Sequence, residues 1–140
     1  MDDGAFWALI AVMGERTDED AVQRLTAALQ ARGSKAARPF AERLVRVLYD
    51  LDREVLFRQP VRFDDEEPEG LADADVEPIP LSDDSFLYLR AGIVARGRSV
   101  HEQVLADPEV LQRGTWPECE ELLYVADEVA GVEIGTKISY

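Results

Sequence analysis

The sequence predicts an all-α or mainly α protein, a small single-domain bundle of about five to six helices with a long acidic, proline-containing loop. Two observations lead to this prediction. Apolar residues recur every three to four positions along most of the chain, and residues that start or stop helices flank these stretches. With 140 residues, 46% of them hydrophobic, the chain can bury one core, so residues 1–140 are treated as one domain.

The first two predicted helices lie before residue 33. The first runs from about Gly4 to Met13, behind Asp2 and Asp3. The second begins at Thr17, whose hydroxyl can cap the free amides of a helix start, and stops before Gly33. The apolar residues at helical spacing in these stretches are Phe6, Leu9, Ile10, Met13, Val22, Leu25 and Leu29.

The third predicted helix is the longest and the central one, from about Ala36 to Leu56. Its core-facing residues are predicted to be Phe40, Leu44, Val47, Leu48, Leu51 and Val55. The opposite side carries Val45, Tyr49 and Leu56, which indicates either contact from two directions or an apolar patch for a partner. We favour core packing.

The helical pattern breaks between Gln59 and Leu81, and residues 59–81 are predicted to form an acidic loop or insertion. The segment contains four prolines, which are Pro60, Pro68, Pro78 and Pro80. A loop of about 20 residues in a compact domain is usually functional or disordered. Val61 and Phe63 have the residue types of a short strand that can pair elsewhere.

Charge is distributed unevenly along the chain, whose net charge is −14. Residues 1–63 carry 10 acidic and 10 basic residues, residues 64–84 carry 10 acidic and no basic residue, and the remainder carries 9 and 5. Such a charge repels nucleic acids and anionic membranes and attracts cationic partners. We therefore expect no nucleic acid and no membrane among the partners, and a basic protein as the possible partner.

The fourth and fifth predicted helices have marked ends. The fourth starts at Ser82, with acidic residues in its first turn, and ends at Arg96 and Gly97. The fifth runs from Ser99 to Gly114 and is restarted by Asp107–Pro108, as a cap and a first-turn proline would do.

The sixth predicted helix opens at Thr115 with Pro117 and ends at Gly131. One face of it is predicted to carry Cys119, Leu122, Leu123, Ala126, Val129 and Ala130. The remaining residues, Val132 to Tyr140, are predicted to be a strand or a loose tail.

Metal, cofactor and catalytic motifs are not evident in the sequence. A zinc site needs several soft ligands, and the chain has one cysteine, Cys119, and one histidine, His101. The alternation of Asp73, Asp75 and Glu77 resembles a calcium loop, but Pro78 occupies the position where that loop needs glycine. No nucleophile motif lies near the histidine. We expect no metal, no cofactor and no catalytic residues.

A cytoplasmic location is the default expectation. A single cysteine cannot form an internal disulfide, and the longest apolar stretch, Phe6 to Met13, is far shorter than a membrane span.

Arg90 stands out on the fourth predicted helix because it falls near the middle of the apolar arc, with Asp83 on the same side. A buried guanidinium is costly unless it is paired, so we predict that Arg90 meets a carboxylate or several backbone carbonyls. Glu118, on the flank of the last helix, is the candidate carboxylate. A buried tie between helices is favoured over an anion or substrate site.

Three further surface features have a functional and an ordinary interpretation. Arg98, between Gly97 and a helix start, suits a phosphate, but helix capping explains the turn equally well. Tyr124 is predicted to be exposed, as in protein interfaces, although single exposed tyrosines are common. Arginines 43, 46 and 53 share a side of the third helix, and acidic neighbours at pairing distance favour a salt-bridged surface over a nucleic-acid patch.

Several strings carry a family resemblance. They are Phe6-Trp7 with Leu9-Ile10, Ser82 to Phe86 continuing through Tyr88, Arg90, Gly97 and Arg98, then Ala106-Asp107-Pro108, and Glu120 to Ala126. Together they resemble the bacterial family called domain of unknown function 4240. Residues 59–81 look like an insertion, and Gly92 stands where the resemblance leads us to expect a large aromatic residue. The resemblance implies a small, mostly helical bacterial domain with no assigned activity.

The leading hypothesis is a non-enzymatic protein-interaction module of the bacterial cytoplasm that uses an acidic surface to bind a basic partner. An immunity or antitoxin-like role against a cationic enzyme is one version of it. The alternative is an enzyme or a small-molecule or anion sensor with a site between the fourth and sixth helices. The residues proposed for binding are Asp83, Arg90, Arg98, Glu118 and Tyr124.

Overall fold

The computed structural model describes residues 1–64 and 81–131, and these form seven α-helices, three 3-10 helices and no strand. The predicted mainly α class is confirmed. Most of the predicted 59–81 loop and the tail from Val132 lie outside the described residues. Among the described helices, none is both long and apolar enough to cross a membrane.

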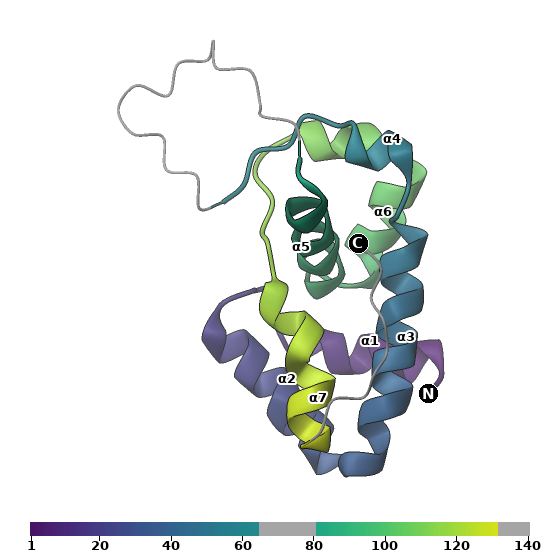
Figure 1. Cartoon of the computed structure of the whole chain (residues 1–140), viewed down its shortest axis with the longest axis vertical. Helices are drawn as coiled ribbons and strands as arrows, with labels where there is room; N and C mark the ends of the chain where they lie inside the picture. The colour runs from purple at the N-terminus through teal and green to yellow at the C-terminus, as the bar shows by residue number, and fades with distance from the viewer. Residues whose placement is uncertain (65–80, 132–140) are drawn as a thin grey trace.

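The helices form two groups joined by one long helix (Figure 1). α3 (Ala37–Asp50) contacts both groups. Beside its first half lie α1 (Asp3–Ala11), α2 (Glu19–Ala31) and α7 (Val125–Ala130). Near its far end lie α4 (Glu54–Phe57), α5 (Asp83–Ala95) and α6 (Arg98–Ala106). All seven α-helices contribute residues to one cluster of buried apolar side chains.

Short polar side chains cap three helix starts. Asp2 accepts a hydrogen bond from the amide of Ala5, and Ser82 accepts one from the amide of Ser85. The prediction that Thr17 caps the second helix was wrong. Asp18 is the cap, with its carboxylate 2.8 Å from the amide of Ala21. A carboxylate at this position satisfies a free amide and also suits the positive end of the helix dipole.

The third helix is shorter than predicted. α3 ends at Asp50, Arg53 is extended, and the chain restarts as α4. The break changes which residues face the core, so Val55, predicted to be buried, is 49% exposed, and Leu56, predicted on the opposite side, is 1% exposed. Tyr49, at 73% exposed, lies on the solvent side of α3.

The last predicted helix also begins later than expected. Residues 115–119 are not helical, and the helical part begins with the 3-10 helix η3 (Glu120–Tyr124), which leads directly into α7. The segment 115–119 instead crosses α5, where the amide of Cys119 donates to the carbonyl of Tyr88 over 3.1 Å. The backbone of Pro117 passes so close to Gly92 that a Cβ on Gly92 would lie 1.9 Å from the Pro117 oxygen. This contact explains why Gly92 cannot be an aromatic residue in this chain.

The expected strand after Gln59 is reduced to one bridge. Phe63 pairs in parallel with Trp116, through hydrogen bonds from Asp64 N to Trp116 O (3.0 Å) and from Trp116 N to Arg62 O (2.8 Å). The bridge attaches the end of the first half of the chain to the segment that crosses α5.

The restart at Asp107 is also different from the prediction. A 3-10 helix, η2 (Pro108–Gln112), begins with the expected proline, but Asp107 does not cap it through its side chain. The backbone carbonyl of Asp107 instead accepts a hydrogen bond from Val110 N over 3.0 Å.

Candidate functional site

Arg90 is buried, as its place on the helical arc predicts, with only 2% of its surface exposed. Its Nη1 donates to the carbonyl of Leu48 over 3.0 Å, and its guanidinium carbon lies 4.8 Å from the centre of the Phe86 ring. Burial lowers the pKa of the Arg90 guanidinium, and the negative charge of Asp52 opposes this shift. Arg90 thus joins α5 to the end of α3.

Two kinds of partner were predicted for Arg90, a carboxylate or several backbone carbonyls, and the described residues supply one backbone carbonyl and no carboxylate. Among the described residues, neither Glu118 nor any other carboxylate lies within 4.0 Å of the Arg90 nitrogens, and Nε of Arg90 has no hydrogen-bond partner. Glu118 lies on the segment that crosses α5, and the first turn of α5 carries Asp83, which is exposed. Arg90 is therefore held by one backbone carbonyl and an aromatic ring.

His101 was not predicted to have a role, yet it contacts the backbone carbonyl next to the one that Arg90 binds. It is 5% exposed, and its Nε2 lies 3.1 Å from the carbonyl oxygen of Val47. Because a carbonyl only accepts hydrogen bonds, Nε2 carries the proton. The ring also lies 5.3 Å from the ring of Trp7, and Nε2 lies 4.0 Å from Oδ2 of Asp50. The burial of His101 could have been predicted from its position three residues before Val104, which is buried on the same helix.

Arg90 and His101 together bind two consecutive carbonyls in the last turn of α3. The last carbonyls of a helix have no partner within the helix, and they carry the negative end of its dipole. Val47 and Leu48 are both buried, and Leu51 N already donates to the carbonyl of Leu48 over 3.2 Å. Side chains from α5 and α6 add hydrogen bonds to these two carbonyls, and this supports the interpretation of Arg90 as a structural tie.

The remaining predicted site residues do not converge on Arg90. Arg98 lies in the first turn of α6 and forms an exposed ion pair with Glu102 of the same helix over 3.2 Å. Asp83, Arg90 and Arg98 form no hydrogen bond or ion pair with one another. Neither of the two described surface hollows is lined by any of these three residues.

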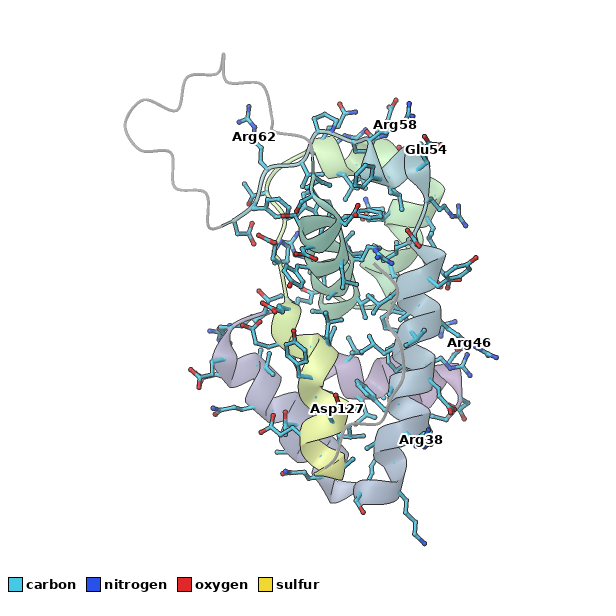
Figure 2. The ribbon with its side chains drawn as sticks, viewed as in Figure 1. Arg38, Arg46, Glu54, Arg58, Arg62 and Asp127 are labelled. Atoms are coloured by element: carbon cyan, nitrogen blue, oxygen red, sulfur yellow. The ribbon has the colours of Figure 1, made fainter. Side chains whose placement is uncertain are left out.

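The arginine side of α3 is not salt-bridged as predicted. Arg43 pairs with Asp3 of α1 over 2.8 Å and donates to the carbonyl of Met1, rather than to a neighbour on its own helix. Arg46 and Arg53 form no ion pair within the described part of the chain. Figure 2 shows Arg46 extending from α3 away from the other helices.

Cys119 is not a candidate nucleophile. The thiol is fully buried, and this burial raises its pKa to about 11, so it remains protonated at neutral pH. Among residues 1–64 and 81–131, no group of three or more histidine, cysteine, aspartate or glutamate residues is placed to hold a metal ion.

Tyr124 lies at a groove between α2 and the η3–α7 segment. It is 51% exposed, in agreement with the prediction, and its hydroxyl donates to Glu120 over 2.9 Å. The groove has a volume of about 680 Å³. Its described lining residues are Thr17, Glu19, Val22, Gln23, Thr26, Ala27, Gln30, Glu121, Tyr124 and Glu128.

The charged residues among this lining are all acidic. Glu19 comes from α2, Glu121 from η3 and Glu128 from α7, and all three are exposed. The groove therefore combines a hollow surface with negative charge on both of its walls, an arrangement that attracts cationic groups. The residues of α2 in this groove were not predicted as a site, because the pairing of α2 with α7 is not visible in the sequence.

The comparisons with known proteins give one match. A family model described as "Protein of unknown function (DUF4240)" matches residues 1–129. No curated protein and no solved structure matches the chain.

Proposed function

Because the chain belongs to the DUF4240 family of proteins of unknown function, which brings no activity with it, we propose a function from the site itself: a non-enzymatic module that binds a basic protein partner. The observation that carries this proposal is the groove between α2 and η3–α7, in which every charged described lining residue is a glutamate. The net charge of −14 supports it, since electrostatic complementarity selects and steers oppositely charged partners.

The alternative, an enzyme or a small-molecule or anion sensor around Arg90, has less support. Arg90 and His101 are bound to carbonyls of α3, and Arg98 is paired with Glu102 on the surface. A binding site needs polar groups that converge on a shared space.

The proposal places the module in the bacterial cytoplasm, where a single reduced thiol is ordinary. One version of the proposal is an immunity or antitoxin-like role, in which the basic partner is a cationic enzyme.

The test begins with capture of partners from an extract of the native host, followed by purification of each captured protein. Its affinity for the chain is then measured by calorimetry at two or more salt concentrations. The groove variant Glu19→Gln with Glu121→Gln and Glu128→Gln should bind about tenfold more weakly, because exposed ion pairs each contribute a fraction of a kcal/mol. Added salt should weaken the parent complex.

The matched control removes three exposed acidic charges outside the groove, through Glu15→Gln, Glu42→Gln and Glu109→Gln. This control should keep most of the affinity. Equal losses in both triple variants, or partners that are not basic, would contradict the proposal.

A further inference from the structure

The groove follows the direction of two helices that pack side by side. α2 and α7 are in contact, and Figure 1 shows them next to each other. The α2 residues of the groove are Glu19, Val22, Gln23, Thr26, Ala27 and Gln30. They recur every three to four positions, so they form one stripe about 16 Å long. The opposite wall has the same spacing, with Glu121, Tyr124 and Glu128.

Three of the four residues in the middle of the α2 stripe, Val22, Thr26 and Ala27, have short side chains, and the fourth, Gln23, donates along its own helix to Glu19 over 3.2 Å. Val22 and Ala27 have few atoms beyond Cβ, and the hydroxyl of Thr26 already donates to the carbonyl of Val22 over 2.9 Å. Short side chains between two longer rows let another helix approach closely, which is the ridge-and-groove geometry of helix packing. The glutamates lie toward the ends and the far wall of the groove, where they remain exposed.

From this arrangement, and resting on the proposed function, we propose that the occupant of the groove is one cationic amphipathic α-helix of the partner protein. A helix of about three turns matches the length of the stripe. Its small apolar residues pack on Val22, Thr26 and Ala27, and lysine or arginine residues on its flanks meet Glu19, Glu121 and Glu128. The ring of Tyr124 offers a face for one of these cations.

A helix is favoured over an extended peptide by the surroundings of the groove. A peptide that adds as a strand needs an exposed sheet edge, and the described residues contain only the isolated Phe63–Trp116 bridge. Both walls of the groove are helical, and their lining residues recur every three to four positions, as the contact residues of a third helix would.

The test uses two synthetic peptides of 14 residues with identical composition, labelled with a fluorophore. One places alanine and leucine at helical spacing with lysine and arginine on the flanks. The other has the same residues in an order that gives no apolar face. Fluorescence anisotropy measures binding of each peptide to the parent chain and to the variants Ala27→Gln and Ala106→Gln. Ala27→Gln adds bulk to the α2 wall of the groove without a change of charge. Both alanines are exposed helix residues, and Ala106 lies outside the groove.

We expect the amphipathic peptide to bind the parent and Ala106→Gln equally, and to bind Ala27→Gln at least tenfold more weakly. The scrambled peptide should bind the parent at least tenfold more weakly. The proposal of a helical occupant is overturned if both peptides bind equally and Ala27→Gln has no effect, while the variant with Glu19→Gln, Glu121→Gln and Glu128→Gln binds more weakly. The proposal of a basic partner then still stands. Failure of both peptides to bind, together with a captured partner whose affinity ignores the groove glutamates, would overturn both proposals.

Discussion

The end of α3 and the groove between α2 and η3–α7 use charge in opposite ways. At the end of α3, Arg90 and His101 are at most 5% exposed, and both bind backbone carbonyls. In the groove, the three glutamates are exposed to solvent. Burial of a polar group costs free energy unless its bonds compensate, whereas an exposed carboxylate stays hydrated and is open to a partner. Variants at the first region should therefore change stability, and variants at the second should change binding.

The largest expected effect concerns the contact between α5 and the segment that leads into one wall of the groove. Gly92 of α5 lies against Pro117, which precedes η3, one wall of the groove. Gly92→Ala forces a backbone shift, because the new Cβ would lie 1.9 Å from the Pro117 oxygen. We expect a loss of about 3 kcal/mol in the free energy of unfolding, or failure to fold. Urea unfolding followed by circular dichroism measures it.

Gly4→Ala is the matched control for this change. In α1, the closest atom to the added Cβ is Asp2 Oδ1 at 3.5 Å, an ordinary contact. Alanine is also the better helix former, so we expect unchanged or slightly higher stability. Equal stability of the two variants would show that the segment 115–119 can move away from α5 at no cost.

The next largest effect concerns Arg90. Arg90→Ala leaves the carbonyl of Leu48 without this donor and opens a cavity beside Phe86, so we expect a loss of about 3 kcal/mol. Arg90→Met keeps much of the buried volume and removes the desolvated charge, so the loss should be about 1 kcal/mol. Both are measured by urea unfolding. If both variants matched the parent, Arg90 would not be the buried tie that its contacts indicate.

His101→Ala should destabilise the fold by about 2 kcal/mol, because Val47 loses a donor at its carbonyl and Trp7 loses a ring contact. Near-ultraviolet circular dichroism reports on the tryptophan environment in the same sample. Arg98→Ala is the control, since within residues 1–64 and 81–131 Arg98 forms only an exposed ion pair with Glu102 of α6. A loss as large in Arg98→Ala as in His101→Ala would remove the distinction between the buried and the exposed groups of α6.

The two regions also differ in how much of them the sequence predicts. Local rules were sufficient for the ends of α5 at Ser82 and Arg96, and helical angles were sufficient to place Arg90 in the core. Backbone carbonyls were one of the two partners predicted for Arg90, but the carbonyl that it binds was not predictable, because α3 ends at Asp50 without a glycine or proline to mark the break. The choice between Thr17 and Asp18 as a cap is also a contest between neighbours that both suit the role.

For the groove, the exposure of Tyr124 was predictable from its own helix, but the site was not. Its two walls are separated by about 90 residues of sequence, and only the packing of α2 on α7 brings them together. Periodicity identifies the buried face of each helix, and it does not say which helices become neighbours.

The smallest expected effect completes the contrast between the two regions. The variant with Glu19→Gln, Glu121→Gln and Glu128→Gln should raise the free energy of unfolding by roughly 0.5 kcal/mol or less, because it relieves repulsion in a chain with a net charge of −14. Thermal unfolding at low and high salt measures this change, and the gain should shrink with salt as the repulsion is screened. A clear loss of stability would mean that the glutamates hold the groove together, and their exposure would then no longer be a reason to assign them to a partner.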